Sequence, residues 1–211
     1  MNFKAIIFDL DGVICFTDKY HYLAWKKAVE PLGVEFNEKI NDRLRGVSRM
    51  ESLNIILERY PGKLIEEEKQ ALCTYKNELY REYLMEMSSA DVSAEVLATL
   101  TTLKGKGLKL AIGSSSKNAQ TILDRLGITE LFDAISDGNN ITHSKPDPEV
   151  FQKAAAYLGL SPGDCMVVED AESGVDAGIA GGFSVAGLGP ASKYAKATYK
   201  LDHFSDILQY I

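Results

Sequence analysis

The chain has 211 residues, of which 45% are hydrophobic and 25% charged, and its formal net charge is −7. These fractions are ordinary for a globular protein and exclude the disordered, collagen-like and disulfide-dense classes. The acidic balance argues against nucleic-acid and membrane partners, which bind basic surfaces. Three cysteines without metal-ligand spacing, and the lack of a long apolar segment, predict a soluble, cytoplasmic protein.

Short apolar runs alternate with helical patterns along most of the chain, beginning with the run KAIIF at residues 4–8. The length and continuous apolarity of this run favour a buried parallel strand over a helix. Strands separated by helices imply right-handed crossovers, so the expected fold class is α/β, with a doubly wound, Rossmann-like parallel sheet. Further strands are expected at residues 108–112, 132–135, 165–168 and 183–186, and helices at residues 94–106, 117–126, 147–158 and 171–180 and from residue 203 onward.

A segment between residues 17 and 87 interrupts this alternation, because it has almost no strand-like runs. Apolar side chains recur in it at helical spacing, over residues 49–60 and 64–87. Near the other end, six of the 17 glycines fall between Gly174 and Gly189, which is typical of tight turns between helices and strands. We therefore predict two domains, an α/β catalytic core of residues 1–15 and 89–211 and an all-helical cap of residues 16–88 inserted after the first strand.

Polar side chains directly follow several of the predicted strands. Because ligands of open parallel sheets bind outside the carboxyl ends of the strands, these residues are candidates for a site. Carboxylates beside a lysine and several hydroxyls suit a divalent cation next to a phosphate. The candidates are Asp9 and Asp11 after the first strand, residues 114–118 (SSSKN) after the second, Lys145 before a later helix, and Glu169 and Asp170 after the fourth strand.

Each of these groups also has a purely structural interpretation. Two aspartates separated by one residue are common in solvated turns, and serines often cap helices. A lysine in a loop is usually solvated, and an adjacent Glu–Asp pair can stabilise the start of a helix. Four such groups at one edge of one sheet nevertheless favour a cation and phosphate site over four unrelated features.

Four motifs together resemble those of the haloacid dehalogenase superfamily of aspartate-based phosphotransferases. The motifs are the DLDG run at residues 9–12, the strand-terminal Ser114, the SKPDP run that contains Lys145, and the VVED run at residues 167–170. The resemblance covers essentially the whole chain, and it implies a magnesium-dependent enzyme with the α/β core already expected from the strand pattern.

The resemblance also implies a role for each core residue. Asp9 would be the nucleophile that attacks phosphorus, and Asp11 would be the general acid and base. Ser114, the Ser115 amide and Lys145 would bind the oxygens of the transferred phosphoryl group. The ligands implied for one Mg²⁺ per chain are Asp9, Asp11 through its backbone carbonyl, Glu169 and Asp170.

The helical segment contains residues similar to those of the bacterial β-phosphoglucomutases within this superfamily. An enzyme of that group would interconvert β-D-glucose 1-phosphate and D-glucose 6-phosphate through an aspartyl phosphate and bound β-glucose 1,6-bisphosphate. Arg49 would hold the distal phosphate, and residues 116–118 would bind the second phosphate of the sugar. The substrate-binding residues implied are His21, Trp25, Gly46, Val47, Ser48, Arg49, Ser52, Lys76, Ser115, Ser116, Lys117 and Asn118.

Simpler interpretations exist for the helical segment and for the function. His21 and Trp25 can pack together on one helix face, Lys76 can extend its ammonium to solvent, and residues 46–49 can form a surface loop with a capping serine. The alternative function is a sugar-phosphate phosphatase of the same superfamily, and a third is a non-catalytic phosphate-sensing or partner-binding module. The expected partner is a small phosphorylated sugar, with no nucleic acid, no membrane and a monomeric state.

Overall fold

The structure, a computed structural model, describes residues 3–44 and 47–211. The chain divides into two compact units: Met1–Phe16 with Ser88–Ile211, here called the core unit, and Thr17–Met87, here called the helical unit. Each junction lies one residue from the corresponding predicted boundary, and the separate roles of the two units in catalysis stay predictions. Within the described ranges, no helix combines the length and apolarity needed to traverse a bilayer.

The core unit contains a six-stranded sheet in which each pair of neighbouring strands is parallel. The strand order is β3-β2-β1-β4-β5-β6, so the chain starts in the middle of the sheet and builds outward on both sides. This order confirms the predicted α/β, Rossmann-like fold class. The strands are β1 (Ala5–Phe8), β2 (Lys109–Gly113), β3 (Ala134–Ser136), β4 (Cys165–Glu169), β5 (Ser184–Leu188) and β6 (Tyr199–Leu201).

One strand of the core unit was not predicted, the tail forms a different type of helix, and several other helix and strand ends are shifted by one or two residues. β6 is missing from the prediction because Leu201 alone among its three residues is buried, which leaves no apolar run to detect. The tail Phe204–Tyr210 forms a 3₁₀ helix. The helix α7 (Glu149–Tyr157) begins two residues later than expected, with Pro148 at its N-cap position.

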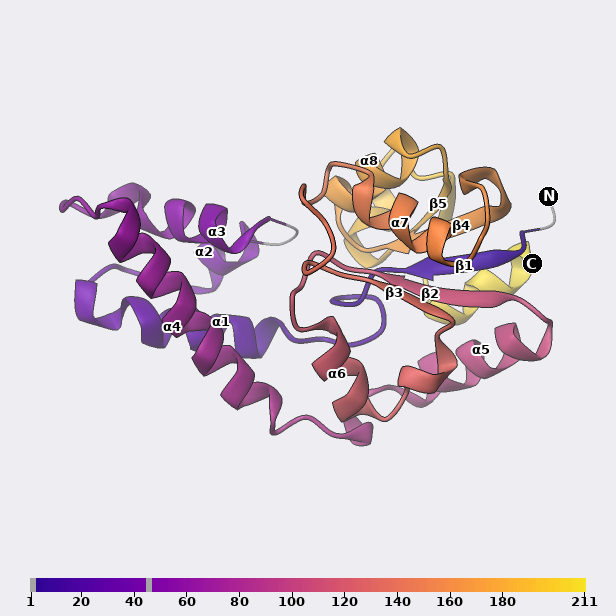
Figure 1. Cartoon of the computed structure of the whole chain (residues 1–211), viewed down its shortest axis with the longest axis horizontal. Coiled ribbons are helices and arrows are strands. Elements are labelled where there is room, and N and C mark those ends of the chain that lie inside the picture. Colours follow the sequence, from indigo (N-terminus) through magenta and orange to yellow (C-terminus); the bar gives the residue numbers. More distant parts are fainter. Residues whose placement is uncertain (1–2, 45–46) are drawn as a thin grey trace. The chain divides into compact units, whose positions relative to one another are not determined.

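Helices cover both faces of the sheet (Figure 1). α7 and α8 (Glu172–Ala180) lie on one face, and α5 (Ala94–Gly105) and α6 (Ala119–Leu126) lie on the other. Because successive side chains of a strand point to opposite faces, Ala5 and Ile7 of β1 join the apolar core shared with α7 and α8. Phe8 instead stacks on Phe204, with 5.5 Å between ring centroids. Burial of both faces explains the uninterrupted apolar runs of the strands.

The first strand ends level with its two neighbours. Phe8 is in register with Ile112 of β2 and Val168 of β4. The next residue continues the pairing, since the Asp9 amide donates to the Val168 carbonyl at 2.9 Å. Because the three strands run in the same direction, the residues that follow them lie at one edge of the sheet. This carboxyl edge holds most of the polar side chains singled out in the sequence.

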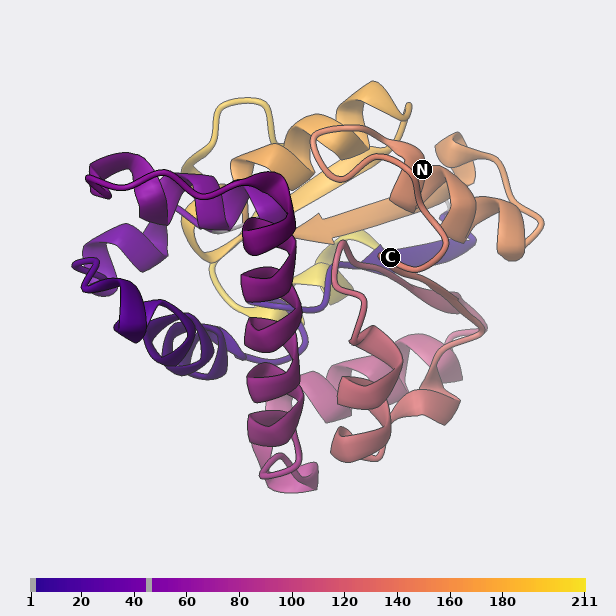
Figure 2. The same ribbon diagram turned by 60° about the vertical axis from the view of Figure 1, so that its left-hand side comes forward.

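The helical unit is described separately. Its α1 packs against α4 and buries Ala24 and Trp25, and its helices are the coils coloured indigo to magenta in Figure 2. The five-residue α2 lies where no element was predicted. α3 begins after Ser48, because the Ser48 hydroxyl accepts a hydrogen bond from the Glu51 amide at 3.2 Å. The helices are α1 (Asp18–Val29), α2 (Glu38–Asp42), α3 (Arg49–Ile56) and α4 (Glu66–Leu84).

Candidate active site

Lys145 lies between two carboxylates at the carboxyl edge of the sheet. Its ammonium donates to Asp9 Oδ1 and, at 2.6 Å, to Glu169 Oε1. The Lys145 side chain is only 3% exposed, and both carboxylates are buried as well. Asp9 follows β1, Glu169 ends β4 and Lys145 precedes α7, so the fold brings together three predicted site residues from distant parts of the chain.

Burial and charge act against one another in this cluster. Desolvation raises the pKa of Asp9 well above its usual range; the charge of Lys145 lowers it, while Glu169 and Asp170 raise it further. Burial alone would lower the pKa of Lys145, but the charges of Asp9 and Glu169 raise it above its ordinary value. Lys145 is therefore a stable ammonium that can neutralise charge on Asp9 or on a group attached to it.

Two glycines provide the space that the site carboxylates occupy. At Gly12, whose φ is +88°, an added Cβ would lie 2.1 Å from Asp170 Oδ2. At Gly174, inside α8, an added Cβ would lie 1.9 Å from Glu169 Oε1. Gly174 lies inside the helix predicted for residues 171–180, and this glycine lets the carboxylate of Glu169 pack directly against that helix.

The carboxylates of the cluster fit a divalent cation. Glu169 and Asp170 both raise the pKa of Asp9 through their charge, which places three acids in one electrostatic neighbourhood with the ammonium of Lys145. A cation of charge +2 would balance the excess negative charge. Oxygen donors suit Mg²⁺ better than zinc or copper. Asp11, two residues after Asp9, is half-buried and its backbone forms a bridge with Cys15.

The loop after β2 presents two hydroxyl groups that each accept a hydrogen bond from a backbone amide. Ser114 Oγ accepts from the Ser116 amide and Ser116 Oγ accepts from the Asn118 amide, both at 3.2 Å. Each hydroxyl proton is therefore free to turn toward a ligand oxygen. Within the described residues, the buried hydroxyl of Ser115 has no hydrogen-bond partner. Such a group costs stability unless a ligand or water satisfies it, which is the behaviour of a binding loop.

In the helical unit, the buried Lys76, Trp25 and Tyr80 form one cluster with the half-buried His21. Lys76 Nζ donates to His21 Nδ1 at 2.8 Å and lies 4.5 Å from the centre of the Tyr80 ring and 5.3 Å from that of Trp25. Because Nδ1 accepts, the ring proton of a neutral His21 is on Nε2. Lys76 is 2% exposed, so the interpretation of Lys76 as a solvated surface lysine is wrong.

The other predicted residues of the helical unit lie around the start of α3. Arg49 is the first residue of that helix, and its Nη2 donates to Asn77 Oδ1 at 2.7 Å. Burial lowers the pKa of Arg49 below its usual value, although it stays charged. Ser52 is buried and its hydroxyl donates to the Ser48 carbonyl at 3.0 Å. Val47 is half-exposed just before this turn, and Gly46 lies outside the described residues.

The surroundings of His21 predict that the protein loses stability in mild acid. Desolvation, Lys76 and Arg49 all hold the pKa of His21 well below 6.5, so the folded state binds fewer protons than the unfolded state at pH values below about 6.5. The free energy of unfolding should therefore fall as the pH decreases through this range, by about 1 kcal/mol between pH 7 and 5.5 from this residue alone.

Urea unfolding followed by the fluorescence of Trp25, the single tryptophan, measures this change. The matched comparison is His21→Gln, which should show a weaker dependence on pH while keeping His143 and His203. The same slope in both proteins would contradict the assignment of a neutral His21.

Comparison with known proteins decides the family to which this geometry belongs. A family model described as haloacid dehalogenase-like hydrolase matches residues 3–182. The chain belongs to this family. It is therefore an enzyme of the family whose members use an aspartate nucleophile and a divalent cation, which agrees with the buried Asp9 and its neighbouring carboxylates.

The proteins to which this chain is similar include both mutases and phosphatases. The chain is 40% identical to a β-phosphoglucomutase of Bacillus subtilis over 97% of its own length and 91% of that protein. It is 30% identical to a phosphorylated carbohydrates phosphatase of Thermotoga maritima, over 85% of this chain and 82% of that one. The crystal structure of a β-phosphoglucomutase from Clostridium difficile superposes with a TM-score of 0.91 and 36% identity, covering 99% of this chain and 95% of that one.

Several residues that shape the site were not among its predicted members. Gly174 makes room for Glu169, Asn77 accepts from Arg49, and Tyr80 packs on His21 with 4.1 Å between ring centroids. The Tyr80 hydroxyl in turn donates to Thr17 Oγ1 at 3.1 Å. Tyr80 carries no sequence signal of its own, because it acts by contact with His21, which is distant in the chain. Gly174 acts instead on Glu169, five residues earlier in the chain.

Proposed function

We propose that this protein is a β-phosphoglucomutase, which interconverts β-D-glucose 1-phosphate and D-glucose 6-phosphate. The observation that carries this proposal is the 40% identity to a β-phosphoglucomutase along 97% of the chain, since the match includes the helical unit as well as the core. The buried Asp9–Lys145–Glu169 cluster supports phosphoryl transfer as the chemistry. A non-catalytic module is disfavoured, because a pure binding protein has no need of a buried nucleophile paired with an ammonium.

The proposed reaction uses the residues of the carboxyl edge in turn. A carboxylate oxygen of Asp9 attacks phosphorus, and the bond from phosphorus to the leaving sugar oxygen breaks. Asp11 gives that oxygen a proton, and later takes a proton from the other sugar hydroxyl as it attacks the phosphoryl group on Asp9. The Lys145 ammonium, the Ser114 hydroxyl and the Ser115 amide would hold the oxygens of the transferred group.

The divalent cation implied by the family would be Mg²⁺, one per chain. Asp9, the Asp11 carbonyl, Asp170 and Glu169 would hold it. Both oxygens of Glu169 already accept hydrogen bonds, from Lys145 and from the Ala171 amide at 2.9 Å, so Glu169 would also keep Lys145 in place. When bound, the ion would offset the repulsion between the Asp9 carboxylate and the phosphoryl oxygens.

A sugar-phosphate phosphatase is the second candidate function. The similarity to the Thermotoga maritima phosphatase favours it, and it would use the same core residues with water as the final acceptor. The two functions differ only in whether a sugar hydroxyl or water takes the phosphoryl group from Asp9. The products of one reaction mixture therefore separate them.

The test supplies the purified protein with β-glucose 1-phosphate, a trace of β-glucose 1,6-bisphosphate and Mg²⁺. We expect glucose 6-phosphate to accumulate with little inorganic phosphate, and both products to disappear when a chelator removes the metal. Stoichiometric release of inorganic phosphate and glucose would establish the phosphatase instead.

Arg49→Ala is expected to weaken binding of a sugar that carries two phosphates more than binding of a simple phosphate ester. A guanidinium paired with phosphate contributes more than a neutral hydrogen bond, so the KM for the bisphosphate should rise about tenfold or more. Steady-state kinetics with β-glucose 1,6-bisphosphate and with p-nitrophenyl phosphate measure the two effects.

The control for this variant is Arg43→Ala in the same helical unit. Arg43 pairs with Glu58 at 2.5 Å, and both side chains are about half exposed, so its removal should change neither KM nor stability appreciably. Equal losses for both phosphate compounds in Arg49→Ala would remove the argument that Arg49 binds the distal phosphate.

A cytoplasmic location, a monomeric state and the lack of nucleic-acid and membrane partners stay predictions.

A further inference from the structure

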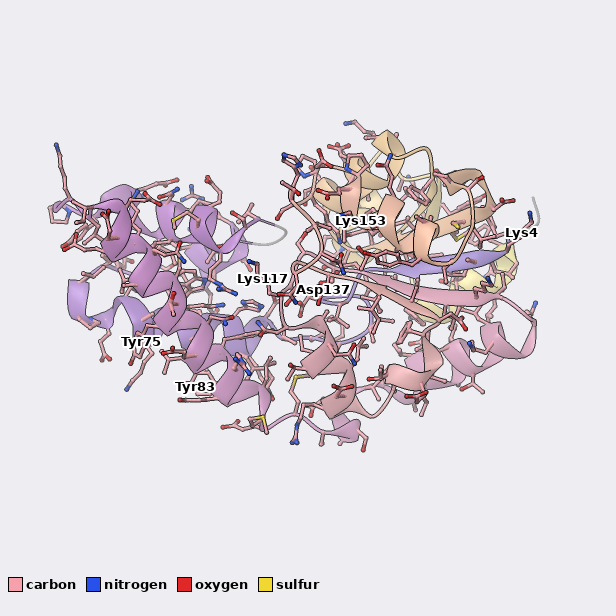
Figure 3. All side chains as sticks on the ribbon, in the orientation of Figure 1. Lys4, Tyr75, Tyr83, Lys117, Asp137 and Lys153 are labelled. Carbon is pink, nitrogen blue, oxygen red and sulfur yellow. The ribbon has the colours of Figure 1, made fainter. Side chains whose placement is uncertain are left out.

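A tight turn after β3 packs against the loop after β2. The turn consists of residues 137–140, here called the DGNN turn, and the loop consists of residues 114–118, here called the serine loop. β2 and β3 are neighbours, and the Ser114 amide donates to the Ser136 carbonyl at 3.0 Å where the strands end. Figure 3 shows Lys117 of the loop beside Asp137 of the turn, at the end of the sheet away from Lys4.

Two residues of the turn bind two successive carbonyl groups of the loop. The Gly138 amide donates to the Ser116 carbonyl at 3.1 Å, and Asn139 Nδ2 donates to the Lys117 carbonyl at 2.9 Å. Because a trans peptide group is planar, a fixed carbonyl also fixes the following N–H in the opposite direction. The Lys117 amide therefore points away from Gly138, and the Asn118 amide points away from Asn139 toward Ser116 Oγ.

Gly138 allows this contact because it has no side chain. A Cβ at this position would lie 2.5 Å from the Ser115 carbonyl oxygen and 3.0 Å from the Lys117 nitrogen. Both are backbone atoms, so they could not rotate away from the added carbon. An alanine here would have to displace the serine loop.

The turn is itself held rigidly. The buried carboxylate of Asp137 accepts from the Asn139 amide at 2.8 Å and from Asn139 Nδ2 at 3.0 Å. Asn140 Oδ1 accepts from the Ser136 hydroxyl at 3.1 Å and from the Asp137 amide at 3.2 Å. Lys153 of α7 donates to the Asn140 carbonyl. The DGNN turn is thus a fixed support on which the serine loop rests.

We propose that Gly138 and Asn139 are positioning residues that orient residues 116–118 of the serine loop to bind the phosphate of the sugar that is not transferred. This inference deepens the proposed function and rests on it. The two residues hold the peptide groups on either side of Lys117, and so direct the Lys117 amide and the Ser116 hydroxyl. Ser114 and Lys145, which would hold the transferred group, lie outside the contacts that Gly138 and Asn139 make.

The test compares Asn139→Ala and Gly138→Ala with Gly163→Ala. Gly163 has no atom within 4 Å of the position of an added Cβ, so it controls for the substitution itself. Loss of the Asn139 hydrogen bonds should raise the KM for β-glucose 1-phosphate about tenfold, while kcat changes less than about threefold. Turnover of acetyl phosphate, which offers a single phosphate, should change less than about threefold in Asn139→Ala. Gly163→Ala should match the wild type.

An unchanged KM for β-glucose 1-phosphate in Asn139→Ala, or a parallel loss with acetyl phosphate, would overturn the inference. Urea unfolding shows whether Gly138→Ala still folds. If it does not fold, the kinetics of Asn139→Ala alone test the positioning role.

If the wild type makes no glucose 6-phosphate, the proposed function fails. Calorimetric binding of glucose 6-phosphate then tests the inference separately, since Asn139→Ala should still weaken it about tenfold; unchanged binding would overturn the positioning role.

Discussion

Asp9→Asn is expected to reduce the turnover of β-glucose 1-phosphate by at least about 10⁴-fold. The asparagine side chain has the shape of aspartate and can still accept from Lys145, but its amide cannot form the acyl phosphate that the reaction requires. The free energy of unfolding should stay within about 1 kcal/mol of the wild type, because the change removes a buried charge that desolvation already disfavours. Steady-state kinetics and urea unfolding measure the two quantities.

The matched control for this variant is Asp133→Asn, also in the core unit. Asp133 precedes β3, accepts from the Leu110 amide at 2.8 Å and pairs with Lys104. This second variant should lose some stability and keep its turnover. Residual activity of a few per cent or more in Asp9→Asn, in a preparation free of wild-type enzyme, would show that another group is the nucleophile.

Lys145→Met is expected to destabilise the protein strongly as well as to inactivate it. Methionine fills a similar volume but leaves Asp9 and Glu169 buried without the ammonium that both contact. Removing one partner from a buried ionic cluster typically costs about 3–5 kcal/mol. Urea unfolding in the presence of a chelator should show a loss of this size, because no added cation can then take the place of the lysine.

An exposed lysine in a comparable pair provides the control. Lys196 lies 2.8 Å from Asp176, with side chains that are 58% and 34% exposed, so Lys196→Met should cost less than about 1 kcal/mol. The double change Lys145→Met with Glu169→Gln should recover part of the loss by removing one of the two unpaired charges. If Lys145→Met lost no more stability than Lys196→Met, the ammonium would not be needed to hold the cluster together.

The fold was predictable wherever burial left a continuous pattern in the sequence. β1, β2 and β4 are covered on both faces, so their residues form apolar runs that identify strands without structural information. β6 and α2 could not be found in this way, since three and five residues with few buried side chains are too short to show a period. Their positions depend on packing rather than on a local preference.

The candidate site was predictable where the topology alone determines proximity. Parallel strands in register bring Asp9 and Glu169 to one edge whatever their neighbours are, so strand ends were sufficient to select them. The support provided by Gly138 and Asn139 could not be predicted. The DGNN run at residues 137–140 has the composition of an ordinary turn, and its importance comes from contacts with backbone carbonyls more than 20 residues away.

The burial of Lys76 shows a third reason why part of the structure could not be predicted from the sequence. A lysine between apolar positions on a helix normally extends to solvent. Here an imidazole acceptor and two aromatic faces, from residues 21, 25 and 80, receive its ammonium instead. The combination arises from the packing of α1 on α4, which no single helix pattern contains.

Trapping the phosphorylated enzyme tests the central claim most directly. The protein, incubated with Mg²⁺ and β-glucose 1,6-bisphosphate labelled in its phosphates, is quenched in acid, reduced with borohydride to mark any acyl phosphate, and digested for mass spectrometry. The account predicts that the mark lies on Asp9 in the wild type and on no residue in Asp9→Asn. A mark on any other side chain, or rapid turnover with no acyl phosphate on Asp9, would contradict it.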